Sequence, residues 1–172
     1  RRQGLLETFL NDLAAHDANE LDKALRYDWN RWARPKQRIP DGDWDILAYV
    51  AGRGGGKTRP GAENMRALAE EWPGINLALM GRTAADVRDV MVNGDSGIIA
   101  CSPPWTRPVY KTSLRLLEWA NGSQGHMYSA DKPDQARGPQ HHGGWGDEVA
   151  AWRGRAALDN LQDGLRLRTV AS

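Results

Sequence analysis

The feature that most constrains how this chain can fold is a glycine-rich segment, residues 51–58 (AGRGGGKT), directly after an apolar run at residues 46–50. Glycines allow successive backbone N–H groups to converge on an anion, because no Cβ atoms stand in the way. The helix expected behind this loop adds unpaired N–H groups and a dipole that favour negative charge. The segment therefore predicts a loop that binds nucleotide phosphates, with Lys57 on the β- and γ-phosphate oxygens and the Thr58 hydroxyl in an Mg²⁺ shell.

The flanking residues have the pattern that such a loop requires. Residues 46–50 indicate a strand buried on both faces of a parallel sheet. Apolar residues at helical spacing after the loop predict a helix with one buried face: Ala62, Met65, Leu68, Ala69 and Trp72. The strict loop motif begins with glycine where this chain has Ala51, so a glycine-rich turn without a ligand remains the alternative.

The rest of the chain predicts an α/β domain behind an N-terminal helical segment at residues 1–34, which contains two amphipathic helices. Residues 77–80 form a second apolar strand, and Thr83 then caps a helix whose buried face is Val87, Val90 and Met91. Residues 114–129 read as a hairpin with a type I′ turn at Asn121-Gly122. A last helix carrying Leu158, Leu161 and Leu165 precedes an extended segment at Thr169-Val170.

Composition excludes several classes of protein. The 172 residues carry 23 basic and 22 acidic side chains, a net charge of +1, which excludes a strongly basic nucleic-acid-binding chain. The single cysteine, Cys101, excludes an internal disulfide framework and a Cys-rich zinc module. No apolar run approaches the ~20 residues that cross a bilayer. We expect an intracellular soluble domain and, because an initiator Met is absent, either a fragment or a chain with altered numbering.

A nucleotide hydrolase also needs carboxylates for Mg²⁺ and for the attacking water, and Asp147-Glu148 is the candidate pair. The strand expected before it, residues 142–146 (HGGWG), is rich in glycine, a poor strand former. Small residues there could let the strand pack close to the phosphate loop. A solvated helix start is the alternative for the pair. His141 and His142 would point to opposite faces of the strand, which disfavours a shared metal ion.

These residues resemble a known family. The run 52–58 (GRGGGKT) is similar to the arginine-containing phosphate loop of tailed-phage large terminases, the ATPases that package DNA into capsids. Residues 32–37 (WARPKQ) resemble the family's adenine-side segment, and residues 129–152 resemble its stretch around the acidic pair. With the closing segments at 158–161 and 164–167, the resemblance covers about residues 30–168.

The resemblance implies a P-loop NTPase of the additional-strand, catalytic-glutamate class, with a central, mostly parallel sheet flanked by helices. It implies an ATPase core at residues 35–172, truncated so that the family's nuclease domain is absent. It assigns nucleotide binding to the loop Gly52, Arg53, Gly54, Gly55, Gly56, Lys57 and Thr58, with Arg34 and Gln37 beside the adenine. Thr58 and Asp147 would bind Mg²⁺, Glu148 would activate water, Arg53 would touch the γ-phosphate, and Arg137 would reach a neighbouring subunit's ATP.

The implied function is ATP hydrolysis that powers double-stranded DNA translocation into a phage procapsid, with ATP and Mg²⁺ as cofactors. The implied partners are double-stranded DNA, the portal protein, the small terminase subunit and other copies in a ring, expected to be a pentamer. The implied location is the host cytoplasm at the procapsid portal, without a membrane. Other P-loop ATPases, such as a helicase-like motor or a small phosphotransferase, remain alternatives. So does a nucleotide-binding assembly module that hydrolyses little alone, and Arg82 and Arg107 are rival arginines for the contact between subunits.

Overall fold

A computed structural model describes residues 18–42, 44–52 and 54–171, with side chains up to residue 166. The chain divides into two compact units, residues 1–34 and 35–172. In the first unit, one helix covers residues 18–26 and α2 covers Trp29–Trp32. The indole Nε1 of Trp32 donates to the carbonyl oxygen of Leu25 (2.8 Å), which ties α2 to the preceding helix. The other amphipathic helix expected before residue 17 lies outside the described residues.

The second unit is built on a seven-stranded sheet in the order β1-β7-β6-β2-β5-β4-β3. The strands in that order are Ile46–Ala48, Leu165–Ala171, His141–Gly146, Asn76–Gly81, Gln124–Ser129, Leu116–Glu118 and Val109–Lys111. Neighbouring strands from β1 to β5 pair in parallel, and β4 and β3 continue the sheet antiparallel. β7 lies between β1 and β6, so an additional strand separates the strand before the glycine loop from the strand before Asp147. The expected mostly parallel sheet is confirmed.

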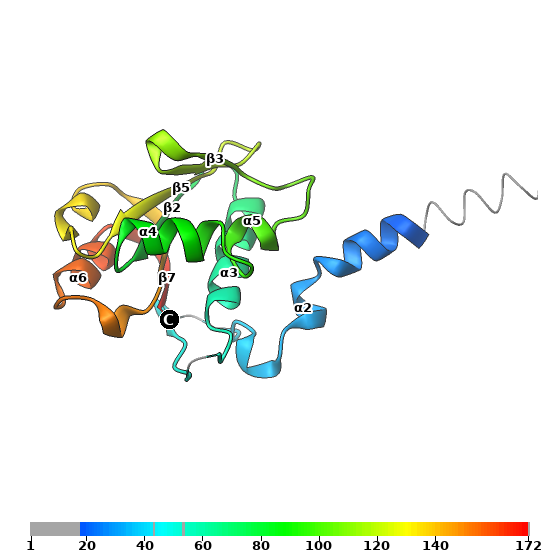
Figure 1. The fold of residues 1–172 in the computed structure, drawn as a ribbon, viewed down its shortest axis with the longest axis horizontal. Helices are drawn as coiled ribbons and strands as arrows, with labels where there is room; N and C mark the ends of the chain where they lie inside the picture. Colours follow the sequence, from blue (N-terminus) through cyan, green and yellow to red (C-terminus); the bar gives the residue numbers. More distant parts are fainter. Residues whose placement is uncertain (1–17, 43, 53, 172) are drawn as a thin grey trace, which may run out of the picture. The chain divides into compact units, whose positions relative to one another are not determined.

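Helices cover both faces of this sheet (Figure 1). One layer contains α3 (Thr58–Glu71), α4 (Ala84–Asp86), the π-helix η2 (Val87–Val92) and α5 (Ile98–Cys101). The other contains α6 (Ala156–Asp163) and the short 3₁₀ turns η4 (Pro133–Ala136) and η5 (Val149–Ala151). β2 serves both cores, because Leu77 and Leu79 face the first layer while Ala78 and Met80 face the second. Two further 3₁₀ turns are η1 (Pro35–Gln37) and η3 (Thr112–Leu114).

The strand before the glycine loop differs from the expectation. Only Ile46–Ala48 are in β1, and β1 lies at an edge of the described sheet rather than inside it. Ile46 is 48% exposed and Val50 is 95% exposed, so the prediction of burial on both faces was wrong for these residues. An unbroken apolar run indicates a strand, but it does not say whether other elements cover both faces of that strand.

The helix after β2 begins as predicted and then changes its period. The Thr83 hydroxyl accepts from the backbone N–H of Asp86, whose carboxylate accepts from the backbone N–H of Thr83, a complete capping box. From Val87 onward the helix is a π-helix, which has more residues per turn than an α-helix. Its buried side chains are therefore Val87, Met91 and Val92, whereas Val90 is 41% exposed. The prediction for Val90 was wrong.

Two other features, a turn and the end of a helix, also differ from the prediction. The hairpin joins β4 to β5, but only Gly122 of the Asn121-Gly122 pair has a positive φ (86°), so the turn is not type I′. The backbone N–H of Gly122 instead donates to the carbonyl oxygen of Trp119 (3.0 Å), which makes a tight turn followed by a left-handed glycine. The last helix, α6, ends at Asp163, and Leu165 begins β7 rather than continuing the helix.

Candidate nucleotide-binding site

The glycine loop connects the carboxyl end of β1 to the first turn of α3. Gly54 and Gly56 have φ values of 76° and 71°, which are unfavourable for residues that have a Cβ atom. A Cβ atom added to Gly55 would lie 2.7 Å from the Cβ of Ala51 and 2.9 Å from the carbonyl oxygen of Gly52. The backbone N–H of Gly55 donates to that same oxygen (3.0 Å). The loop conformation therefore depends on glycine at three successive positions.

Residues on both sides of β1 hold the loop in place. The side-chain amide of Gln37 donates to the carbonyl oxygen of Gly56 (2.9 Å), and the Tyr49 hydroxyl donates to the carbonyl oxygen of Gln37 (3.1 Å). Burial raises the pKa of Tyr49, so its hydroxyl stays a donor. The family resemblance placed Gln37 on the adenine side. Tyr49 was not expected at the site, because no sequence pattern indicates a contact between Tyr49 and Gln37.

Lys57 is the residue that precedes α3. Its ammonium group donates to the carbonyl oxygens of Ala51 (3.0 Å) and Gly52 (3.4 Å), so it is held across the glycine loop. Thr58 is the first residue of α3, and Pro60 lies in the first turn, where the missing N–H costs no helical hydrogen bond. The loop, the lysine and the helix N-terminus thus place positive charge and N–H donors together, as phosphate binding requires.

The acidic pair follows β6 directly. The backbone N–H of Asp147 donates to the carbonyl oxygen of Met80 on β2 (2.9 Å), and the Trp152 indole donates to the carbonyl oxygen of Asp147 (3.0 Å). Asp147 is buried, with 8% exposure. Glu148 is exposed and has a φ of 50°, in the left-handed region that is unfavourable for a residue other than glycine. Strained backbone of this kind is common at functional sites.

One pocket of about 400 Å³ joins these parts. It is lined by Gly54, Gly55, Gly56, Lys57, Thr58, Arg59, Ser96, Asp147 and Glu148. The structure therefore brings the glycine loop and the acidic pair to one cavity at the carboxyl ends of parallel strands, where α/β folds bind ligands. Ser96 was not among the expected residues. A second pocket of about 610 Å³, mostly apolar, shares Lys57 and Glu148 with the first.

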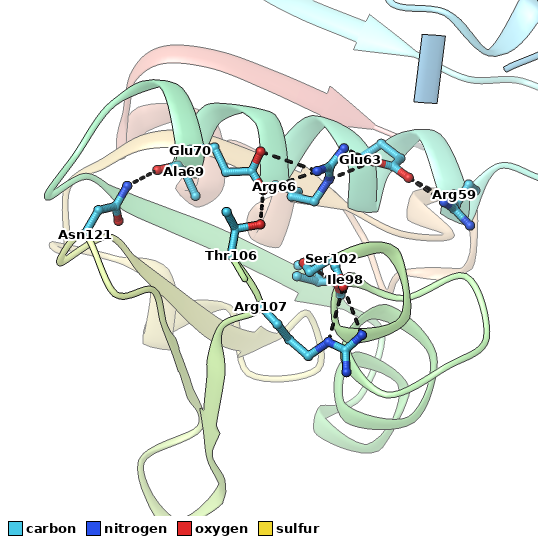
Figure 2. Close-up of polar contacts among 10 residues, drawn as sticks. All are labelled: Arg59, Glu63, Arg66, Ala69, Glu70, Ile98, Ser102, Thr106, Arg107 and Asn121. Carbon is cyan, nitrogen blue, oxygen red and sulfur yellow. Dashed lines mark hydrogen bonds and ion pairs between the residues drawn. The ribbon is translucent and has the colours of Figure 1, made fainter. Parts of the chain in front are cut away.

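A buried charge network, visible in Figure 2, fixes the first turns of α3. The Glu63 side chain is 1% exposed and accepts from Arg59 (2.6 Å) on one oxygen and from Arg66 (2.9 Å) on the other. Arg66 also pairs with Glu70 (3.2 Å), which accepts from the Thr106 hydroxyl (2.7 Å). The carboxylates of Glu63 and Glu70 balance the two arginines, and Arg59 is the member of this network that lines the phosphate pocket. This network was not expected from the sequence, although the i, i+4 and i, i+3 spacings of Arg59, Glu63 and Arg66 are compatible with it.

The glycines of β6 admit neighbours on one face of the strand. A Cβ on Gly144 would lie 3.2 Å from the Leu161 and Leu165 side chains, and one on Gly146 would lie 3.0 Å from Trp152. On the opposite face Trp145 is fully buried against Gly61 of α3. Gly144 and Gly146 thus accommodate side chains of α6, η5 and the residues that follow them, rather than the phosphate loop.

The residues that would hold Mg²⁺ fit this ion by their chemistry. The Thr58 hydroxyl and the Asp147 carboxylate line the same pocket and are hard oxygen donors, which Mg²⁺ prefers, usually with water in its other positions. Within the described ranges, no group of three or more His, Cys, Asp or Glu side chains could hold a metal ion. His141 instead pairs with the Tyr128 hydroxyl (3.0 Å), and His142 Nδ1 accepts from the backbone N–H of Asn76.

The other expected site residues lie elsewhere. Arg53 is outside the described residues, and Arg34 is the exposed last residue of the first unit. Arg137 is exposed after η4 and lines a separate polar pocket of about 370 Å³ with Arg166. No helix in the part of the chain with assigned structure is both long and apolar enough to span a membrane.

A glycine loop before a helix, an acidic pair after a separate strand and an additional strand between them define a P-loop NTPase fold. Residues 48–166 match the family described as the terminase large subunit, T4likevirus-type, N-terminal, and the chain belongs to this family. No curated protein matches the chain.

Solved structures share the fold at low sequence identity. The large terminase of a thermophilic bacteriophage matches with a TM-score of 0.58 and 17% identity, over 87% of this chain and 38% of that chain. The large terminase ATPase domain of Thermus phage P74-26 matches with a TM-score of 0.54 and 17% identity, over 74% of this chain and 59% of that one. The first of these terminases, in complex with ATP-gamma-S, matches with a TM-score of 0.53 and 17% identity, over 87% and 36%. The chain thus spans less than two thirds of each of these proteins.

Proposed function

We propose that this chain is an ATP-hydrolysing motor domain whose activity powers double-stranded DNA translocation into a phage procapsid. The observation that carries the proposal is the single pocket lined by Lys57, Thr58, Asp147 and Glu148. A water-activating carboxylate beside a phosphate-binding loop favours hydrolysis over phosphate transfer to another substrate. Family membership and the complex of the thermophilic phage's large terminase with ATP-gamma-S support the same function.

The loop residues divide the work of binding. The N–H groups of Gly54 and Gly56 and the N-terminus of α3 cradle the phosphates, and Lys57 neutralises charge on the β- and γ-phosphates. Arg53 adds a contact to the γ-phosphate, and Arg34 and Gln37 flank the adenine. Thr58 and Asp147 hold Mg²⁺, which supplies charge neutralisation to the phosphates when bound.

Glu148 is the base of the reaction. Its carboxylate accepts a proton from the water that attacks the γ-phosphorus, while the bond from that phosphorus to the β–γ bridging oxygen breaks. The exposure of Glu148 and its place on the pocket support this role, because an attacking water needs access from outside the loop.

Arg137 acts on the ATP of a neighbouring subunit. It does not line the phosphate pocket of its own chain, so a contact with ATP would have to come from another copy. An arginine suits this role, because its planar guanidinium stays charged and can meet two phosphoryl oxygens. The proposal therefore includes a ring of subunits at the procapsid portal in the host cytoplasm, with the portal protein, the small terminase subunit and double-stranded DNA as partners.

Steady-state phosphate release, measured over a range of protein concentrations with and without double-stranded DNA, tests the proposal. We expect turnover per subunit to rise with concentration and with DNA, and Lys57→Ala to remove it. Mixing Arg137→Ala with Lys57→Ala subunits should restore part of the activity, because one hybrid interface joins an intact Lys57 to an intact Arg137. If the protein binds ATP tightly but releases no phosphate under any of these conditions, the result would instead indicate a nucleotide-binding assembly module.

A further inference from the structure

The phosphate pocket contains one side chain that belongs neither to the glycine loop and α3 nor to the acidic pair. Ser96 lines this pocket and lies in residues 93–97 (NGDSG), between the π-helix η2 and α5. It therefore enters the site from a third part of the chain.

The segment around Ser96 is anchored to the core on both sides. Val92 precedes it and Ile98 follows it, and both are fully buried. The backbone N–H of Gly97 donates to the carbonyl oxygen of Gly94 (2.8 Å), and the Cys101 thiol donates to the carbonyl oxygen of Ser96 (3.4 Å). Ser96 is thus presented by a closed turn rather than by a free loop.

Glycine is required on both sides of this turn. A Cβ on Gly94 would lie 2.6 Å from the carbonyl oxygen of Val90, and one on Gly97 would lie 2.7 Å from that of Val92. Both contacts are with backbone atoms, which cannot move aside cheaply. The π-helix before the turn is a further irregularity of a kind found frequently at functional sites.

The hydroxyl of Ser96 makes no hydrogen bond with any described residue, although the backbone oxygen of the same residue does. Its side chain is partly exposed, on the pocket that Thr58, Asp147 and Glu148 also line. A serine hydroxyl can donate one hydrogen bond and accept others. The acceptors on this pocket are the carboxylates of Asp147 and Glu148 and, with a nucleotide bound, the phosphoryl oxygens.

We propose that the Ser96 hydroxyl donates a hydrogen bond to the γ-phosphoryl group of ATP and so positions it for attack. This inference rests on the proposed ATP site. The glycine loop and the α3 N-terminus surround the β-phosphate, and the γ-phosphate projects from them toward the acidic pair. Ser96 lies in a separate segment that lines the same pocket. We therefore expect it to contact the γ-phosphate, the part of the nucleotide that projects beyond the loop. It is a positioning residue that distinguishes ATP from ADP.

The test compares the affinities for ATP-gamma-S and for ADP in the full chain, by competition with a fluorescent ADP analogue. Ser96→Ala should weaken ATP-gamma-S binding by roughly 10-fold, the usual effect of losing a hydrogen bond to a charged group, and leave ADP binding unchanged. Ser96→Thr keeps a hydroxyl and should retain most of the ATP-gamma-S preference. Ser113→Ala, an exposed serine in η3, is the matched control and should bind both nucleotides as the parent chain does.

The outcomes separate this inference from the proposed function. If Lys57→Ala weakens the binding of both nucleotides but Ser96→Ala leaves the ratio of their affinities unchanged, the inference is overturned and the ATP site stands. An equal loss of affinity for both nucleotides in Ser96→Ala also overturns it, because the hydroxyl would then stabilise the loop or contact the β-phosphate. If Lys57→Ala binds both nucleotides normally, the ATP site and the inference fail together.

Discussion

The side-chain amide of Gln37 donates a hydrogen bond to the carbonyl oxygen of Gly56, across 2.9 Å. This contact joins the segment before β1 to the last glycine of the phosphate loop, and the Tyr49 hydroxyl extends it through the carbonyl oxygen of Gln37. The loop is therefore braced before any nucleotide arrives. The residue that family resemblance assigns to the adenine side has a partner in the loop itself.

Gln37→Ala should weaken binding of ATP and GTP to a similar extent, about 3- to 10-fold, because a hydrogen bond of this kind contributes ~0.5–1.5 kcal/mol. A role confined to the adenine would instead weaken ATP alone. Competition titrations with the two nucleotides measure the difference. Gln140→Ala, a change of an exposed glutamine on the separate polar pocket, is the control and should alter neither affinity.

Glu148→Gly should increase the free energy of unfolding by about 1 kcal/mol while it removes ATP hydrolysis. The gain is expected because Glu148 has a φ of 50°, which glycine adopts at lower cost. Arg115 has the same kind of backbone (φ 51°), so Arg115→Gly should be stabilising too, without loss of activity. Urea unfolding and phosphate release check both variants. A lower stability for Glu148→Gly would mean that its side chain contributes more than the strain costs.

Gly61→Ala should destabilise the fold by ~3 kcal/mol or more, even though alanine is the better helix former. A Cβ at this position would lie 2.2 Å from the ring of Trp145, a fully buried residue of β6 that packs against α3. Ala67→Gly, at an exposed position of the same helix, should cost only about 1 kcal/mol. If thermal and urea unfolding rank the two variants in the opposite order, α3 and β6 are not in close contact at Gly61.

Acidification should destabilise the domain through His141. Burial, with the charges of His126 and His142, lowers the pKa of His141 to about 4, and its exposure is 2%. Between pH 6.5 and 4 the unfolded chain takes up a proton that the folded chain does not, so the free energy of unfolding falls by up to ~3 kcal/mol. His141→Gln should flatten this dependence in urea titrations across that range. An unchanged slope would show that His141 titrates normally in the folded state.

Much of this architecture follows from local sequence. The glycine loop, the acidic pair after β6 and the capping box at Thr83 each have a short-range pattern with a physical cause. The covering of a strand's two faces has no such pattern, which is why burial on both faces was expected at residues 46–50 although Ile46 and Val50 are exposed. The π-helix could not be foreseen either, because the sequence around Val90 fits an ordinary helical period.

The site was only partly predictable for a related reason. Lys57, Thr58, Asp147 and Glu148 belong to contiguous motifs, so their types and order are informative. Ser96 and Tyr49 reach the site or its support through tertiary contacts between distant segments, and nothing in the neighbouring residues indicates this. The buried Glu63 lies between these cases, since its spacing from Arg59 and Arg66 is visible but its burial is not.

The measurement that tests the central claim most directly is a comparison of Glu148→Gln with the parent chain, in nucleotide binding and in phosphate release under assembling conditions with double-stranded DNA. Glutamine keeps the size and hydrogen-bonding capacity of the side chain but cannot accept the proton of the attacking water. We predict that Glu148→Gln binds Mg-ATP as tightly as the parent chain and hydrolyses it ~10²-fold or more slowly. Normal hydrolysis by Glu148→Gln would contradict the account, because the base would then lie outside this pocket.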